Sequence, residues 1–180
     1  YDVAHDLAHH LEVLRNALQL AHELNDEELD FDVLRIAALW HDIPVPGSVE
    51  KNSERTAEYL EHKMREIGFH KDFIKKAYDA VSRHSFGQQP TTIEGKVLYD
   101  ADKLELLNLQ RLSRYHRAVE QGKAPRQKAE ADFRRVADNF KTLRGTLHFE
   151  ASKRRFDLAY EKLRQASTAK AIFKSYGVDL

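Results

Sequence analysis

The stretch Asp32-Val-Leu-Arg-Ile-Ala-Ala-Leu-Trp-His-Asp-Ile-Pro-Val-Pro-Gly-Ser48 joins an apolar helical segment to a His-Asp pair and a loop. Leu34, Ala38 and His41 fall on one stripe of the predicted helix, so we expect His41 to point toward the core. The prolines and the glycine after Asp42 stop a helix. A helix end lets two consecutive side chains converge on one divalent ion. The alternative is a capping aspartate beside a packed histidine.

Helical periodicity extends on both sides of this stretch. Apolar residues recur at spacings of three and four from Leu7 to Leu24, where Asn25 and Asp26 end the first segment. Further helices are expected at about 53–66, from Gly68 to about His84, and at 93–121, 127–143 and 150–170. No segment alternates with the period of two that is typical of a half-buried strand. The sequence therefore predicts an all-α, single-domain helical bundle.

Composition limits the chemistry that the chain can carry. With 180 residues, 42% of them hydrophobic, the chain has the length and apolar content of one domain with a real core. It has no Cys, which excludes disulfides, thiolate metal sites and a cysteine nucleophile and favours a reducing compartment. No apolar run approaches the roughly 20 residues that span a bilayer, and no leader precedes Tyr1. We expect a soluble, cytoplasmic protein with no membrane partner and a metal held by His and carboxylates.

The charge balance argues against nucleic acid as a partner. The 29 basic and 29 acidic residues give no net charge, which excludes the strong field of a dedicated nucleic-acid binder. Residues 1–66 nevertheless carry 15 acidic and 6 basic side chains, whereas residues 111–155 carry 5 acidic and 13 basic ones. This asymmetry fits either the steering of an anionic substrate or two solvated helix faces that neutralise each other.

Two aspartates, Asp100 and Asp102, lie inside an otherwise apolar predicted helix. Buried carboxylates are costly unless they are paired or bind a cation. Asp102 shares a stripe with Leu98 and Leu106, and Asp100 shares another with Leu104, so periodicity does not choose between them. Histidines that are candidate partners crowd the first helix: His5, His9 and His10.

The chain has a histidine on its first predicted helix, a His-Asp pair at the end of the second and an aspartate within the fifth. This order of features resembles the HD-domain superfamily of metal-dependent phosphohydrolases. The matching segments are His5-Asp-Leu-Ala-His9, Ala37-Ala-Leu-Trp-His-Asp-Ile43, Val81-Ser-Arg-His-Ser-Phe86 and Pro90-Thr-Thr-Ile-Glu-Gly-Lys-Val-Leu-Tyr-Asp-Ala-Asp-Lys-Leu-Glu105. The last two are similar to a bacterial and archaeal subgroup of predicted HD hydrolases. The resemblance implies an HD-type core at residues 1–120, with residues 121–180 as a helical extension packed on the same domain.

The resemblance also implies the site. Its metal ligands are His9, His41, Asp42 and Asp102, with Asp100 as the alternative to Asp102. These ligands suit one divalent ion of Mn, Fe, Co, Ni or Zn, with Mg less favoured. The implied reaction is hydrolysis of a phosphate ester of a small anionic substrate, such as a nucleotide, by a metal-activated water. The candidates for proton transfer or phosphate contact are Asp42, His84, Glu54 and Glu58.

Two positions depart from the family pattern. Glu12 stands where the family often has Arg, and Lys51 and Asn52 stand where a further His is common, which argues against a full dinuclear site. The alternative interpretations of the chain are a non-enzymatic, metal-stabilised regulatory or binding module and a hydratase or oxygenase on the same fold. The oligomeric state is left open.

The remaining histidines and three arginines are not assigned as metal ligands. His5 and His10 either support His9 or face solvent. The histidines expected at the surface are His22, His62, His70, His116 and His148. Arg111, Arg114 and Arg117 recur every three residues and are expected to form a solvated basic face, with phosphate binding as the alternative.

Overall fold

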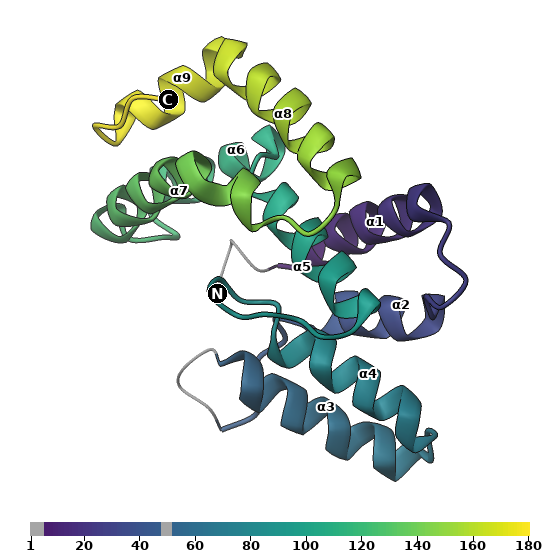
Figure 1. The fold of residues 1–180 in the computed structure, drawn as a ribbon. Coiled ribbons are helices and arrows are strands. Elements are labelled where there is room, and N and C mark those ends of the chain that lie inside the picture. The colour runs from purple at the N-terminus through teal and green to yellow at the C-terminus, as the bar shows by residue number, and fades with distance from the viewer. Residues whose placement is uncertain (1–5, 48–51) are drawn as a thin grey trace. The chain divides into compact units, whose positions relative to one another are not determined.

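The computed structural model describes residues 6–47 and 52–180, and every regular element in these ranges is an α-helix (Figure 1). The all-α prediction is therefore confirmed. In chain order the helices of the described part are α1 (Leu7–Leu24), α2 (Phe31–Trp40), α3 (Ser53–Ile67), α4 (Lys71–Ser82), α5 (Ile93–Glu105), α6 (Leu109–Glu120), α7 (Arg126–Thr146), α8 (Glu150–Gln165) and α9 (Ser167–Ser175).

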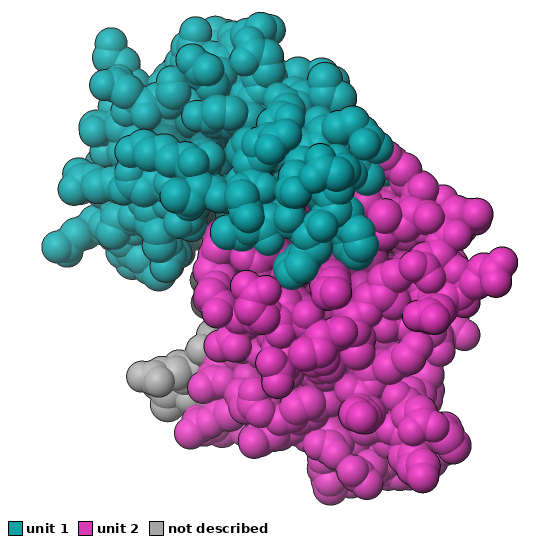
Figure 2. Space-filling model, viewed as in Figure 1, with its two compact units in different colours: residues 1–6, 103–180 teal, residues 7–102 magenta. Residues whose placement is uncertain are grey.

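The chain forms two compact units (Figure 2). Unit 2 comprises the described residues from Leu7 to Asp102, and unit 1 comprises Asp6 together with residues 103–180. The predicted boundary between an HD-type core and a helical extension, after residue 120, does not coincide with the boundary between these units, after Asp102. The division into core and extension stays a prediction.

Unit 2 is built from helices whose ends are fixed by local sequence. Asp30 caps α2, because its carboxylate accepts hydrogen bonds from the backbone N–H groups of Asp32 and Val33 at 3.0 and 3.1 Å. Asn52 caps α3 in the same way, and Gly68 ends α3 in the left-handed conformation at φ 89° that glycine tolerates best. α1 packs on α2, α2 on α4, and α3 on α4.

A buried carboxylate of α5 connects α5 with α2 and α4. Glu94, in the first turn of α5, is fully buried and accepts hydrogen bonds from Asp30 N at 3.0 Å and Lys76 Nζ at 2.8 Å. It thereby links the start of α5 to the start of α2 and to α4. The starts of α2 and α5 lie together in unit 2, and the far ends of these two helices carry His41 and Asp102.

Unit 1 has a core of its own in which aromatic rings predominate. Phe133 stacks on Tyr176 with ring centroids 4.3 Å apart and meets Phe173 edge-to-face at 5.2 Å. Such pairs add to the stabilisation that the burial of apolar area supplies. α6 packs on α9 and α7, and α8 packs on α7 and α9.

Two of the predicted helices are interrupted. The predicted helix 93–121 is two helices, α5 and α6, because the chain turns at residues 106–108 and Asn108 caps α6. The predicted helix 150–170 ends at Gln165, and α9 starts after Ala166, whose backbone is extended. The other predicted helices agree with the structure to within a few residues at each end.

Within residues 6–47 and 52–180, none of the helices is both long enough and apolar enough to cross a membrane.

Candidate metal centre

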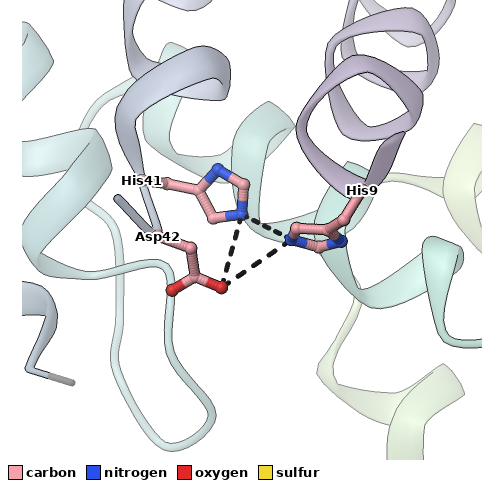
Figure 3. Close-up of side chains that lie close together, drawn as sticks. All are labelled: His9, His41 and Asp42. Atoms are coloured by element: carbon pink, nitrogen blue, oxygen red, sulfur yellow. Dashed lines mark hydrogen bonds and ion pairs between the residues drawn. The ribbon is translucent and has the colours of Figure 1, made fainter. Parts of the chain in front are cut away.

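Two buried histidines face each other inside unit 2 (Figure 3). His9 lies in the first turn of α1, and His41 is the residue that ends α2. Their Nε2 atoms are 3.0 Å apart, and neither residue has any exposed surface. The apolar stripe that ends at His41 accounts for this position, as the sequence predicts.

The hydrogen bonds of His41 and His84 define which ring nitrogen carries the proton. Nδ1 of His41 lies 2.9 Å from the carbonyl oxygen of Ala38, and Nδ1 of His84 lies 2.7 Å from that of Val81. A carbonyl oxygen only accepts, so Nδ1–H is the donor in both rings. In the neutral form, each Nε2 therefore presents a lone pair to the interior of the site.

Asp42 lies between the histidines and presents a different oxygen to each side. Its Oδ2 is 3.7 Å from His9 Nε2 and 3.8 Å from His41 Nε2, as the dashed lines to Asp42 in Figure 3 mark. Its Oδ1 is 3.4 Å from His84 Nε2. His84 is 4% exposed, and the three buried imidazoles thus surround one carboxylate.

Asp102 completes the group from α5. Its Oδ1 lies 3.6 Å from His9 Nε2 and 3.8 Å from His41 Nε2. Asp100 is two residues earlier on the same helix, about 200° away around its axis, and is fully buried. The geometry therefore favours Asp102 over Asp100 as the carboxylate that faces His9 and His41.

The chemistry of these atoms fits a divalent cation. The Nε2 lone pairs of His41 and His84 and the carboxylate oxygens are acceptors, so a positive charge among them makes their close approach favourable. Two nitrogen ligands that each lie about 2.1 Å from an ion, with a right angle between the two metal–nitrogen bonds, are about 3.0 Å apart. The Nε2 atoms of His9 and His41 have this separation, 3.0 Å. The residues present thus fit the metal that the sequence predicts, although ligation itself stays a prediction.

Helix ends add to this preference for a cation. His41 ends α2, His84 follows the end of α4, and Asp102 lies in the last turn of α5. The C-terminal end of a helix carries a partial negative charge. Three such ends therefore contribute negative potential to the same site.

The pKa of His41 responds to the carboxylates of the site. Burial alone would lower the pKa of the ring, but the nearby carboxylates of Asp102 and Asp42 raise it above its ordinary value of 6.5. A bound divalent ion would take the place of this proton.

His10 is the histidine whose position the sequence left open. It is 7% exposed, and its ring centroid lies 5.4 Å from that of His9 and 5.1 Å from that of His41. Of the two alternatives, the structure therefore favours support of His9 over exposure to solvent. His5 and Lys51 lie outside the described residues.

The two glutamates proposed as bases lie on α3 and are exposed. The carboxylate of Glu54 accepts a hydrogen bond from the Tyr78 hydroxyl, an interaction that raises the pKa of Tyr78 to about 12. Glu54 is thus held by α4. Its role as a base, and that of Glu58, stay predictions.

Two expectations about surface residues need correction. Arg111 is only 13% exposed, and its Nη1 lies 2.8 Å from Oε2 of the buried Glu105, so it is not part of a solvated face. Arg114 is 31% exposed, whereas Arg117 is exposed as predicted. Of the histidines expected at the surface, His116 and His148 are half-buried. Nδ1 of His116 lies 2.9 Å from the hydroxyl oxygen of Tyr176, a buried residue of the unit 1 core.

Comparison with known proteins identifies the family of the stretch that carries these residues. A family model described as the HD domain matches residues 6–107, which include all the histidines and aspartates of the site. Among solved structures, the chain is similar to a protein of an uncultured Thermotogales bacterium described as a predicted HD superfamily hydrolase. The identity is 25%, the alignment covers 90% of this chain and 77% of that one, and the TM-score is 0.64.

A second similar structure is that of Bacillus subtilis YpgQ, with 20% identity, coverage of 96% of this chain and 89% of that one, and a TM-score of 0.67. The structure of YpgQ in complex with ADP matches with 22% identity, coverage of 89% and 84%, and a TM-score of 0.61. At this identity, the likeness to YpgQ shows the fold alone. The comparison with curated proteins gives no match.

Proposed function

The chain belongs to the HD domain family, and we propose that it is a metal-dependent phosphohydrolase whose ion is held by His9, His41, Asp42 and Asp102. The family and the similar Thermotogales structure support a metal-dependent hydrolase. The observation that carries the ligand set is the 3.0 Å approach of the His9 and His41 Nε2 atoms, with a carboxylate oxygen of Asp42 and one of Asp102 each within 3.8 Å of both.

The mixed nitrogen and oxygen ligands favour Mn, Fe, Co, Ni or Zn over Mg, which prefers oxygen ligands. We propose one ion per chain. When bound, such an ion lowers the pKa of a coordinated water and polarises a phosphoryl oxygen.

The residues around the ligands have supporting roles in this proposal. The Ala38 carbonyl fixes the ring of His41, so that Nε2 points inward. Asp42 Oδ1 and His84 Nε2 face each other at 3.4 Å, just beyond the usual hydrogen-bond distance, so a proton taken up by either group would lie beside the other. We assign to this pair the acceptance of the proton from the attacking water, with Glu54 and Glu58 as the alternatives.

The substrate that we propose is a small phosphate ester, and specifically a nucleotide. The crystal structure of YpgQ in complex with ADP supports this class, since that protein has a similar fold. The zero net charge of the chain supports a small ligand over a nucleic-acid polymer.

The test is hydrolysis by metal-stripped protein after separate addition of Mn²⁺, Co²⁺, Ni²⁺ and Mg²⁺, with nucleoside mono-, di- and triphosphates as substrates. We expect phosphate or pyrophosphate release that depends on the metal, is weakest with Mg²⁺ and is lost in His41→Ala. Metal uptake without turnover of any substrate would favour a non-enzymatic module. Uptake of two ions with a redox-active optical signature would favour an oxygenase.

A further inference from the structure

Outside the candidate metal centre, one side chain of α4 binds both ends of a loop. Asp79 Oδ2 accepts hydrogen bonds from Thr91 N at 3.0 Å and from Thr92 N and Oγ1, both at 2.9 Å. Its Oδ1 accepts a hydrogen bond from Thr91 Oγ1 at 2.7 Å and lies 3.2 Å from Arg83 Nε. A single carboxylate therefore connects Arg83, where α4 ends, with Thr91 and Thr92, where α5 is about to begin.

The loop between these residues is closed by a further contact. Arg83 Nη1 donates a hydrogen bond to the carbonyl oxygen of Gln89 at 3.3 Å. We call Asp79, Arg83, Thr91 and Thr92 the loop clamp.

The first turn of α5 packs directly against this clamp. A Cβ added at Gly95 would lie 2.9 Å from Pro90 Cβ, 3.0 Å from Thr92 Oγ1 and 3.1 Å from Asp79 Oδ2, distances at which a neighbour must shift. Glycine thus allows the helix to approach the clamp closely. Thr92 Oγ1 also accepts a hydrogen bond from Gly95 N at 3.1 Å, so the clamp caps α5 as well as closing the loop.

The clamped loop carries His84, the residue directly after Arg83. The ring of His84 is held at Nδ1 by the Val81 carbonyl and meets Asp42 Oδ1 with Nε2 at 3.4 Å. The helix that the clamp caps carries Asp102. Asp79 is therefore linked to two residues of the candidate centre, and its own side chain is 13% exposed.

We propose that Asp79 is a positioning residue of the metal centre, which holds His84 against Asp42 by fixing both ends of the loop between α4 and α5. This proposal rests on the proposed function, because it assigns Asp79 a role in a site that binds a divalent ion. Asp79 makes no contact with substrate in this proposal. It acts through His84, and its effect on metal binding should therefore require His84.

The experiment is a double-mutant cycle on Co²⁺ affinity, measured on the 180-residue chain by competition with a chromophoric chelator. The variants are Asp79→Asn, His84→Ala and the double variant, and the visible absorption of bound Co²⁺ reports the ligand geometry. Asp79→Asn should weaken Co²⁺ binding about tenfold, the lower end of the effect of residues that orient ligands. In the His84→Ala background, the same substitution should change the affinity less than about twofold, because residues that act as a unit are not additive.

Asp132→Asn is the matched control. Asp132 is a carboxylate of unit 1 that is 18% exposed and accepts hydrogen bonds from Lys128 and Tyr115, both at 2.7 Å. It should leave the Co²⁺ affinity unchanged. If Asp79→Asn does not fold, Thr91→Val replaces it in the cycle, since this change removes one side-chain hydrogen bond and leaves the backbone bonds of the clamp.

The outcomes separate the two proposals. A wild-type protein that binds no Co²⁺ overturns the proposed function and the role of Asp79 with it. If the wild-type protein binds Co²⁺ and Asp79→Asn binds it equally tightly, the proposed metal centre stands and the role of Asp79 is overturned. Equal losses of affinity with and without His84 would also overturn it, because they would show that Asp79 acts independently of His84.

Discussion

His41 ends a helix and presents a ring nitrogen to the candidate centre at the same time. Its backbone N–H donates to Ala37 O at 2.9 Å, as the next residue of α2 would, and its Nδ1 binds the Ala38 carbonyl. His84 repeats the second arrangement with Val81, three residues before it. A histidine at the end of a helix can therefore satisfy an orphan carbonyl and fix its own tautomer with one bond.

The assignment of the fourth ligand is tested by the two aspartates of α5. Asp102→Ala should lose bound metal and hydrolysis together, since one of four ligands is removed and the remaining buried groups are left without it. Asp100→Ala should keep its metal and lose at most part of the activity. Metal content and initial rate are measured on both variants, with His41→Ala as the positive control. If only Asp100→Ala empties the site, the assigned face of α5 is wrong.

Asp79 gives a pH dependence of stability whose sign follows from its hydrogen bonds. Burial opposes ionisation, but the bonds from Thr92 and Thr91 outweigh it and hold the pKa of Asp79 below its ordinary value of 3.8. The charged form therefore stabilises the folded state above about pH 3.8, and this stabilisation is lost as the pH falls through the folded-state pKa.

Asp79→Asn should accordingly lower the free energy of unfolding by about 1–3 kcal/mol at pH 7, as expected for hydrogen bonds to a charged group. The deficit should shrink as the pH falls from 4 toward 3. Urea unfolding of metal-free protein across this range measures it, with the exposed Asp72→Asn as the control. A deficit that is the same at pH 7 and pH 3 would contradict the role of the charge.

At the scale of the helices, the sequence predicts the elements well wherever an apolar stripe ends at a capping residue or a breaker. Asn25 and Gly68 mark the ends of α1 and α3 in the pattern, and the structure agrees. The break between α5 and α6 is missed because Leu104, Leu107 and Leu109 continue the apolar spacing through it. The turn depends instead on Asn108, whose capping role is visible only once the backbone is known.

Asn108→Ala tests this origin of the break. The Asn108 side chain accepts hydrogen bonds from Gln110 N at 2.8 Å and from Arg111 N at 3.4 Å. Its loss should lower the free energy of unfolding by about 1 kcal/mol, the usual cost of an N-cap. Gln110→Ala is the control in the same turn, because that side chain is exposed. Equal stability of the two variants in urea would show that packing, and not the cap, sets the start of α6.

At the scale of the whole molecule, the sequence suggests which residues form the candidate centre but not the hydrogen bonds that hold the neighbouring loop. His9, His41, Asp42 and Asp102 are spread over 94 positions of the chain, and unit 2 brings them together. Their residue types and their places on apolar stripes are readable without a structure. The loop clamp around Asp79 is not, because its hydrogen bonds join α4 to backbone groups whose positions depend on the tertiary fold.

The most direct test of the central claim is the metal content of protein purified without a histidine tag, determined by elemental analysis alongside His41→Ala. We predict about one divalent transition metal per wild-type chain and almost none in the variant, because His41 supplies one of the four ligands. A folded wild-type protein that holds no metal and takes up none, or a His41→Ala variant that retains the same amount, would contradict the account.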